Sequence, residues 1–142
     1  MKEGRVLAID YGEVRVGVAI SDPLRIFAFP LLVIDLRKTE DCIKEIQKIV
    51  IDKDIKKIII GLPLQLDGKE GIQSGKVREF YREIKENIQN VDIELVDERL
   101  TTTSAQKTLT NIGLSIKKQR GVVDKIAAAK LLEMYLEREK RR

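Results

Sequence analysis

The sequence predicts an α/β domain in which a five-stranded mixed sheet carries helices on both faces. Three apolar runs with strand patterning follow one another near the N-terminus, and their connections are too short to hold a helix. Two further apolar runs are each preceded by a segment with helical spacing. The last part of the chain has helical spacing and no strand after it. The predicted order of elements is therefore β-β-β-α-β-α-β-α-α.

The predicted elements are placed from their apolar patterns and from the turn residues that end them. The strands are expected at Arg5–Asp10, Val14–Ser21, Phe29–Leu36, Lys57–Gly61 and Val91–Val96. The helices are expected from Thr39 to Val50 and at Ser74–Ile88, Thr102–Asn111 and Val122–Arg138. Only Tyr11-Gly12-Glu13 lies between the first two strands, which favours a hairpin.

The order of the elements limits how the strands pair. Three strands with short connections form an antiparallel meander, whereas strands separated by helices return parallel to the first strand through right-handed crossovers. The simplest packing is a sheet of order 3-2-1-4-5 with helices on both faces, which is the three-layer RNase H-like arrangement. A doubly wound dinucleotide-binding fold needs helices between its first strands, and there is no room for them here. We expect a single domain over residues 1–142.

Composition limits the chemistry that such a domain can perform. The chain has no histidine and one cysteine, Cys42, which excludes histidine-based nucleophile systems, His-ligated zinc and an internal disulfide. It shows no signal peptide and no apolar run of membrane-spanning length, so we expect a cytoplasmic protein without membrane contact. Residues 114–142 carry a net charge of +5, against −1 for residues 1–113. This asymmetry favours a polyanionic partner, or it belongs to a solvated helix with a basic tail.

Acidic residues fall at the ends of three predicted elements. Asp10 ends the first strand, Asp97 and Glu98 close the fifth, and Asp124 lies on the apolar stripe of the last helix. Each also has an ordinary structural role open to it, as a turn residue, a strand-end acid or a first-turn helix residue. In the deduced topology these positions converge at one end of the sheet. Oxygen ligands without histidine suit Mg²⁺ or Mn²⁺, which could orient a water and polarise a phosphoryl group.

Two regions near the predicted site are candidates for contact with a substrate. Gly12, Arg15 and Gly17 could bring backbone and a guanidinium against a phosphate, or could serve a tight hairpin and a surface ion pair. The loop Gln65–Gln73 follows a predicted parallel strand and borders the crevice, a position from which it could hold substrate.

Basic and hydroxyl residues beside the acids extend this candidate surface. Arg99 precedes a threonine-rich helix start at Thr101, where free backbone N–H groups can face a phosphate. We expect both residues to bind substrate. Lys117, Lys118 and Arg120 lie in a predicted loop just before Asp124, so we also expect them to hold a nucleic-acid backbone.

Four segments together resemble the YqgF family. They are Ala-Ile-Asp10-Tyr-Gly12-Glu-Val-Arg15-Val-Gly17-Val-Ala, Gly61-Leu-Pro63-Leu, Asp97-Glu98-Arg99-Leu-Thr101-Thr and Val123-Asp124-Lys-Ile-Ala127-Ala. YqgF proteins are described as Holliday-junction-resolvase-like, and also as nucleases that mature the 5′ end of the small-subunit ribosomal RNA precursor. The resemblance runs nearly end to end and implies an RNase H-like fold. It places phosphodiester hydrolysis dependent on Mg²⁺ or Mn²⁺ on Asp10, Glu98 and Asp124, as catalytic residues and metal ligands.

One departure from related enzymes bears on the substrate. RuvC-type junction resolvases carry an acid at the end of the fourth strand, where this chain has Gly61, so Glu98 would have to substitute. We therefore expect pre-16S ribosomal RNA as the substrate and a DNA junction as the second candidate, bound by a monomer or weak homodimer. A non-catalytic nucleic-acid-binding or transcription-associated module is a rival interpretation, and the presence of all three acids argues against it. A sugar-kinase-like ATPase shares the strand order but needs a second domain.

Overall fold

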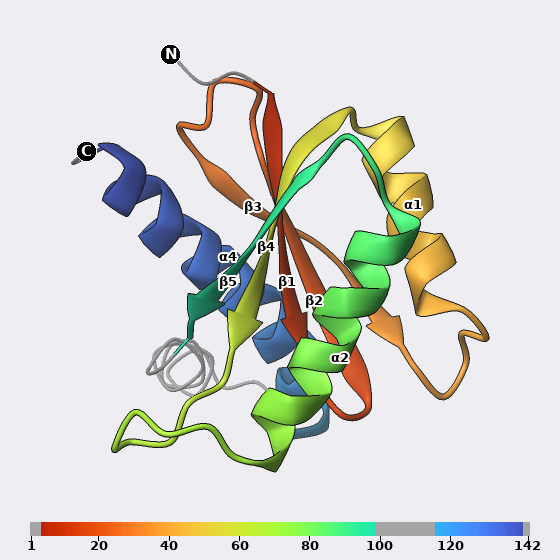
Figure 1. The fold of residues 1–142 in the computed structure, drawn as a ribbon, viewed down its shortest axis with the longest axis vertical. Helices are drawn as coiled ribbons and strands as arrows, with labels where there is room; N and C mark the ends of the chain where they lie inside the picture. Colours follow the sequence, from red (N-terminus) through yellow and green to blue (C-terminus); the bar gives the residue numbers. More distant parts are fainter. Residues whose placement is uncertain (1–3, 99–115, 141–142) are drawn as a thin grey trace.

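The computed structural model describes residues 4–98 and 116–140 and contains the predicted five-stranded sheet, in the order β3-β2-β1-β4-β5 (Figure 1). The strands are β1 (Arg5–Tyr11), β2 (Arg15–Ser21), β3 (Ala28–Asp35), β4 (Ile55–Leu62) and β5 (Asp92–Asp97). The helices described are α1 (Cys42–Asp52), α2 (Ile72–Asn87) and α4 (Ile116–Lys140). Strand bounds differ from the predicted ones by at most two residues.

β1 is the central strand. It pairs antiparallel with β2 and parallel with β4, and the outer strands β3 and β5 pair antiparallel with β2 and parallel with β4. The Gly12 N–H donates to the Arg15 carbonyl oxygen at 2.9 Å and closes the predicted hairpin between β1 and β2. Side chains of a strand alternate between the two faces, and those of β1 are buried on both. This explains why β1 is a continuous apolar run in the sequence.

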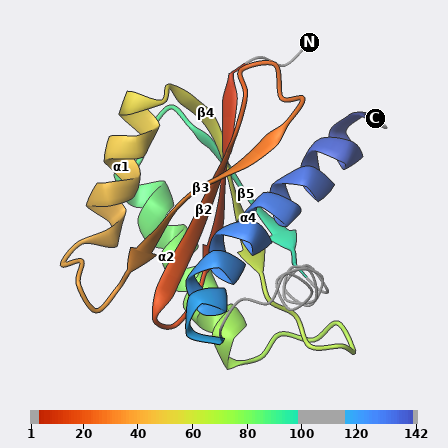
Figure 2. The same cartoon turned by 180° about the vertical axis from the view of Figure 1, so that it is seen from behind.

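Helices cover both faces of the sheet, as predicted (Figure 2). On one face α1 and α2 pack through Ile46, Val77, Phe80 and Ile84 against residues such as Leu7 and Ile60. On the other face α4, among the helices described, packs through small and large apolar side chains. These are Ala128, Ala129, Leu131, Leu132, Tyr135 and Leu136. Neither α4 nor the other helices of the described ranges have the length and apolar character that a membrane span requires.

All three described helices begin at residues other than those predicted, and α2 begins at Ile72, two residues before the predicted Ser74. α1 begins at Cys42 and not at Thr39, because the Asp41 side chain caps it by accepting from the Lys44 N–H at 3.1 Å. α4 begins at Ile116 and not at Val122, since residues 117–120 are strong helix formers although they have no apolar spacing. The prediction that Lys117, Lys118 and Arg120 lie in a loop is therefore wrong, because their backbone is helical. The predicted helix Thr102–Asn111 lies outside the described residues.

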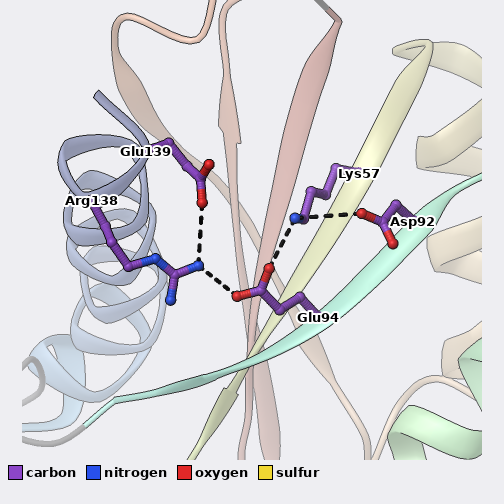
Figure 3. Close-up of polar contacts among 5 residues, drawn as sticks. All are labelled: Lys57, Asp92, Glu94, Arg138 and Glu139. Carbon is purple, nitrogen blue, oxygen red and sulfur yellow. Dashed lines mark hydrogen bonds and ion pairs between the residues drawn. The ribbon is translucent and has the colours of Figure 1, made fainter. Parts of the chain in front are cut away.

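A charged network ties α4 to the edge of the sheet (Figure 3). Lys57 of β4 is buried, and its ammonium lies 2.9 Å from Glu94 and 3.5 Å from Asp92, both on β5. The Arg138 guanidinium of α4 reaches the other carboxylate oxygen of Glu94 at 2.5 Å. Burial alone would lower the pKa of Lys57, but contacts with Tyr135 and Glu94 outweigh it and raise this pKa to about 12. Lys57 thus stays charged and joins β4, β5 and α4.

Candidate active site

Asp10 lies near the end of the central strand, with a glycine beside it on each neighbouring strand. Gly17 of β2 pairs directly with Asp10. On the other side, the parallel register that pairs Ile9 with Ile60 puts Gly61 of β4 next to Asp10. Directly paired residues share a face of the sheet, and alternation from the buried residues of β1 places these three on the face that α4 covers. The space on both sides of the Asp10 side chain is therefore open to groups from outside the sheet.

Gly17 lets the backbone of α4 approach the sheet at Asp124. A Cβ atom at position 17 would overlap the Asp124 carbonyl group and lie 3.0 Å from the Lys125 nitrogen. Ala127 and Ala128, one turn further on, are buried and continue this close contact. Asp124 lies about two turns inside α4, so its interpretation as an N-cap or first-turn residue is wrong. The glycine and the alanines together bring this part of the helix beside the end of β1.

Gly61 leaves room for the carboxylate of Glu98. A Cβ atom at position 61 would overlap the Glu98 Oε2 atom and lie 2.9 Å from its Cδ and 3.2 Å from the Leu131 Cδ2. The Glu98 N–H donates to the Leu62 carbonyl oxygen at 3.3 Å, so the pairing with β4 continues one residue past β5. The Glu98 carboxylate thus occupies the space that a side chain at the end of β4 would fill.

The carboxyl groups of Asp10 and Glu98 form a hydrogen-bonded pair in which both pKa values are raised. Burial, the Asp10 charge, the hydrogen bond to Asp10 and the Asp97 charge raise the pKa of Glu98 to about 9. Burial also raises the pKa of Asp10, and the hydrogen bond with Glu98 opposes that rise. At neutral pH the Glu98 carboxyl group is therefore the protonated partner, and it donates to the Asp10 carboxylate.

Asp124 joins this pair electrostatically. Burial and the negative charge of Asp10 raise the pKa of Asp124 to about 6, while the guanidinium of Arg15 acts to lower it. Arg15 begins β2 across the hairpin from Asp10, so it brings positive charge to the acids. Asp97 is the residue before Glu98, and successive side chains of a strand point to opposite faces of the sheet. The Cβ of Asp97 therefore lies on the face covered by α1 and α2.

The chemistry of these side chains fits a hard divalent cation, although their arrangement is not a ready-made cage. Across the part of the chain that the structure describes, no three His, Cys, Asp or Glu side chains are arranged to hold a metal ion. Asp10, Glu98 and Asp124 nevertheless all have raised pKa values, because each is buried near another acid. A divalent cation in place of the Glu98 proton would relieve this repulsion. The predicted metal-ligand set remains a prediction.

The remaining predicted substrate contacts are placed only in part. Lys117, Lys118 and Arg120, which we call the α4 basic triplet, lie in the first turns of α4, and their side chains are outside the described residues. Arg99 and Thr101 also lie outside the described residues.

Sequence reasoning missed the role of two glycines. The sequence predicts a hairpin or phosphate-binding role for Gly17, and it marks Gly61 as the position where RuvC-type resolvases carry an acid. In the structure they admit the α4 backbone and the Glu98 carboxylate. Both lie inside apolar strands, and a glycine in a strand often marks the close approach of another group. That signal was available in the sequence.

Comparison with known proteins agrees with this architecture. The family model RuvX, described as Holliday junction resolvase, matches residues 4–138. A Natranaerobius thermophilus protein named as a candidate pre-16S rRNA nuclease is 36% identical over 135 residues, covering 95% of each chain. A Clostridium acetobutylicum protein of the same name is 42% identical over 132 residues, covering 93% of this chain and 97% of its own.

A solved structure supports the fold independently of sequence. The fowlpox virus resolvase in complex with Holliday junction DNA superposes with a TM-score of 0.58 at 13% identity, covering 95% of this chain and 98% of its own. At that identity the likeness concerns the fold alone. Together with the family match over most of the sequence, it shows that the chain belongs to the RuvX (YqgF) family and has an RNase H-like fold.

Proposed function

We propose that this protein is a metal-dependent endonuclease that hydrolyses phosphodiester bonds of structured nucleic acid and processes the 5′ end of pre-16S ribosomal RNA. One observation carries the proposal: the carboxyl groups of Asp10 and Glu98 meet above Gly61, with Asp124 brought close by Gly17. The names of the curated relatives support the RNA substrate. Family membership supports the nuclease chemistry.

In this proposal Asp10, Glu98 and Asp124 would hold Mg²⁺ or Mn²⁺. When bound, such a cation activates a water and stabilises the charge that develops on the phosphoryl group. Glu98 must release its proton before it can act as a ligand, and Asp10 is the acid in contact with it. Arg15, which already acts on Asp124 electrostatically, is placed to orient a phosphate beside the acids. The chain has no histidine, so these residues supply the protein's part of the chemistry.

Cleavage of a branched DNA is the second candidate function. The family description and the fold shared with a junction-binding resolvase favour it. In the RNA proposal, Glu98, the residue after β5, takes the place of the acid that RuvC-type junction resolvases carry at the end of the fourth strand. The two candidates differ in substrate and share the acids.

A cleavage assay with Mn²⁺ or with chelator separates these possibilities. The parent protein should cut precursor RNA only with the cation, and Asp10→Asn should reduce cleavage at least about a hundredfold. Asp52→Asn, at an exposed acid that ends α1, is the matched control and should cut like the parent. Cleavage of a four-way DNA junction but not of RNA would favour the second candidate. If the parent cuts neither, the chain is a non-catalytic binding module.

A further inference from the structure

The chain between β4 and α2 folds back on itself from Leu64 to Glu70, and we call this segment the finger. Leu64 and Glu70 form an isolated antiparallel bridge. The Gln65 N–H donates to the Lys69 carbonyl oxygen at 2.8 Å, and the Gly68 N–H donates to the Gln65 carbonyl oxygen at 2.8 Å. Gly68 has a φ of +84°, the left-handed region that glycine adopts without strain. The finger therefore has its own hydrogen-bonded turn.

The finger is anchored to the elements around the candidate site. The Arg78 guanidinium of α2 donates to both carboxylate oxygens of Glu70, at 2.6 and 2.8 Å. The Gln73 side-chain amide donates at 3.2 Å to the carbonyl oxygen of Tyr11, the residue after Asp10. These contacts hold the base of the finger to α2 and to the end of β1.

The finger and the residues after it present apolar side chains to solvent. Leu66 is 89% exposed and Ile72, where α2 begins, is 84% exposed. They are the two most exposed large apolar side chains among the residues described. The turn closes through backbone hydrogen bonds, so the packing of Leu66 does not hold it together. Single exposed leucines are common on protein surfaces, but Leu66 lies on an anchored finger that closely follows the end of β4.

The finger lies within reach of a nucleic acid held at the acids. Leu66 follows Gly61 by five residues, so their Cα atoms are at most about 18 Å apart. Figures 1 and 2 both show the segment between β4 and α2 extending past the edge at which β1 and β4 end. Leucine and isoleucine side chains are used by nucleic-acid-binding proteins as wedges between bases, which they partly unstack.

We propose that the finger binds an unstacked nucleobase of the substrate on Leu66, while the acids hold the phosphate that is cut. The inference rests on the proposed nuclease function and deepens it. It assigns the substrate class as nucleic acid with a splayed base next to the cut, at a branch point or at a boundary between duplex and single strand. A continuous duplex offers no such base.

Fluorescence of 2-aminopurine tests this inference, because the probe brightens when it unstacks. The probes are an RNA stem–loop with a single-stranded 5′ extension and a four-way DNA junction, each labelled at the boundary or branch. The full chain carries Asp10→Asn to prevent cutting. Its binding should raise the fluorescence of at least one probe. With that probe, adding Leu66→Ser should cut the rise roughly twofold and weaken affinity about fivefold. The salt dependence of affinity should stay unchanged, since no charge is lost.

Ile51→Ser is the matched control, because Ile51 is 78% exposed and lies on α1, which makes none of the contacts described for the finger. It should bind and unstack like the parent, and both serine variants should keep the parent's melting temperature. Equal behaviour of Leu66→Ser and the parent, or an equal loss in Ile51→Ser, overturns the inference.

A parallel cleavage assay of the chain without Asp10→Asn separates this inference from the proposed function. Cleavage of a probe without any rise in 2-aminopurine fluorescence overturns the finger's role and leaves the nuclease function standing. A fluorescence rise that depends on Leu66, without cleavage of either probe, supports the finger as a base-binding surface and overturns the nuclease function.

Discussion

Replacing Glu98 with glutamine should stabilise the metal-free protein, and more so as the pH rises. Burial and the charges of Asp10 and Asp97 raise the pKa of Glu98 from 4.5 to about 9, so between these values the folded state keeps a proton that the unfolded state has lost. Stability therefore falls as the pH rises through this range. At pH 7 the cost is about 3–4 kcal/mol, from the gap between 4.5 and 7 at about 1.4 kcal/mol per pKa unit. Glutamine keeps the hydrogen bond to Asp10 and does not ionise.

Urea unfolding of the parent and Glu98→Gln, in chelator at pH 4.5, 7 and 8.5, measures this difference. The two proteins should be nearly equal at pH 4.5 and should separate progressively above it. Mn²⁺ should stabilise the parent and have little effect on Glu98→Gln, because a cation can replace the proton only where a carboxylate can form. A variant less stable than the parent at pH 7, or a difference that does not change with pH, would refute the reasoning.

Three further predictions concern packing, the charged network and binding. Gly17→Ala should cost about 2–3 kcal/mol of unfolding free energy because its Cβ meets the α4 backbone, whereas Gly75→Ala, with open space around it, should leave stability unchanged or raise it. Glu94→Gln should cost about 1–3 kcal/mol of unfolding free energy, because the buried Lys57 loses its nearest carboxylate. Glu133→Gln, in an exposed ion pair, is the control and should change stability by less than about 0.5 kcal/mol. Urea unfolding measures the effect of each substitution. Changing the α4 basic triplet to alanine should weaken nucleic-acid binding and flatten the slope of log affinity against log salt by about two. If a salt titration gives the same slope as the parent protein, the substrate is bound elsewhere.

Most of the fold could be predicted because local patterns in this chain agree with the global topology. β1 and β4 are buried on both faces and contain the apolar runs 6–9 and 58–60. The short connections around Gly12 and Asp22 leave only a meander for the first three strands. Asp10 could be placed because it ends the central strand. Asp124 could be singled out because a carboxylate on an apolar helical stripe is costly without a partner.

The parts that could not be predicted depend on contacts between distant segments. The first turns of α4 have helix-forming residues without an apolar pattern, so their helical state leaves no periodic trace. Lys57 starts an apolar run, and its burial depends on partners from β5. The hydrogen-bonded pair of Asp10 and Glu98 forms only when β5 lies beside β4 and the Glu98 carboxylate fills the gap above Gly61.

Among the residues described, β5 lies at the edge of the sheet and pairs with β4 alone, and it leads directly into Glu98. An acid at the end of β4 would have neighbours on both sides and would keep its place whenever the sheet edge opens. When β5 separates from β4, Glu98 leaves the site together with β5. Any cation that Glu98 helps to hold therefore opposes the opening of β5, by about 1.4 kcal/mol when the cation is at ten times its dissociation constant. Cation binding at the site and the pairing of β5 with β4 are therefore thermodynamically coupled. The exchange rate of the β5 amide hydrogens reports on both.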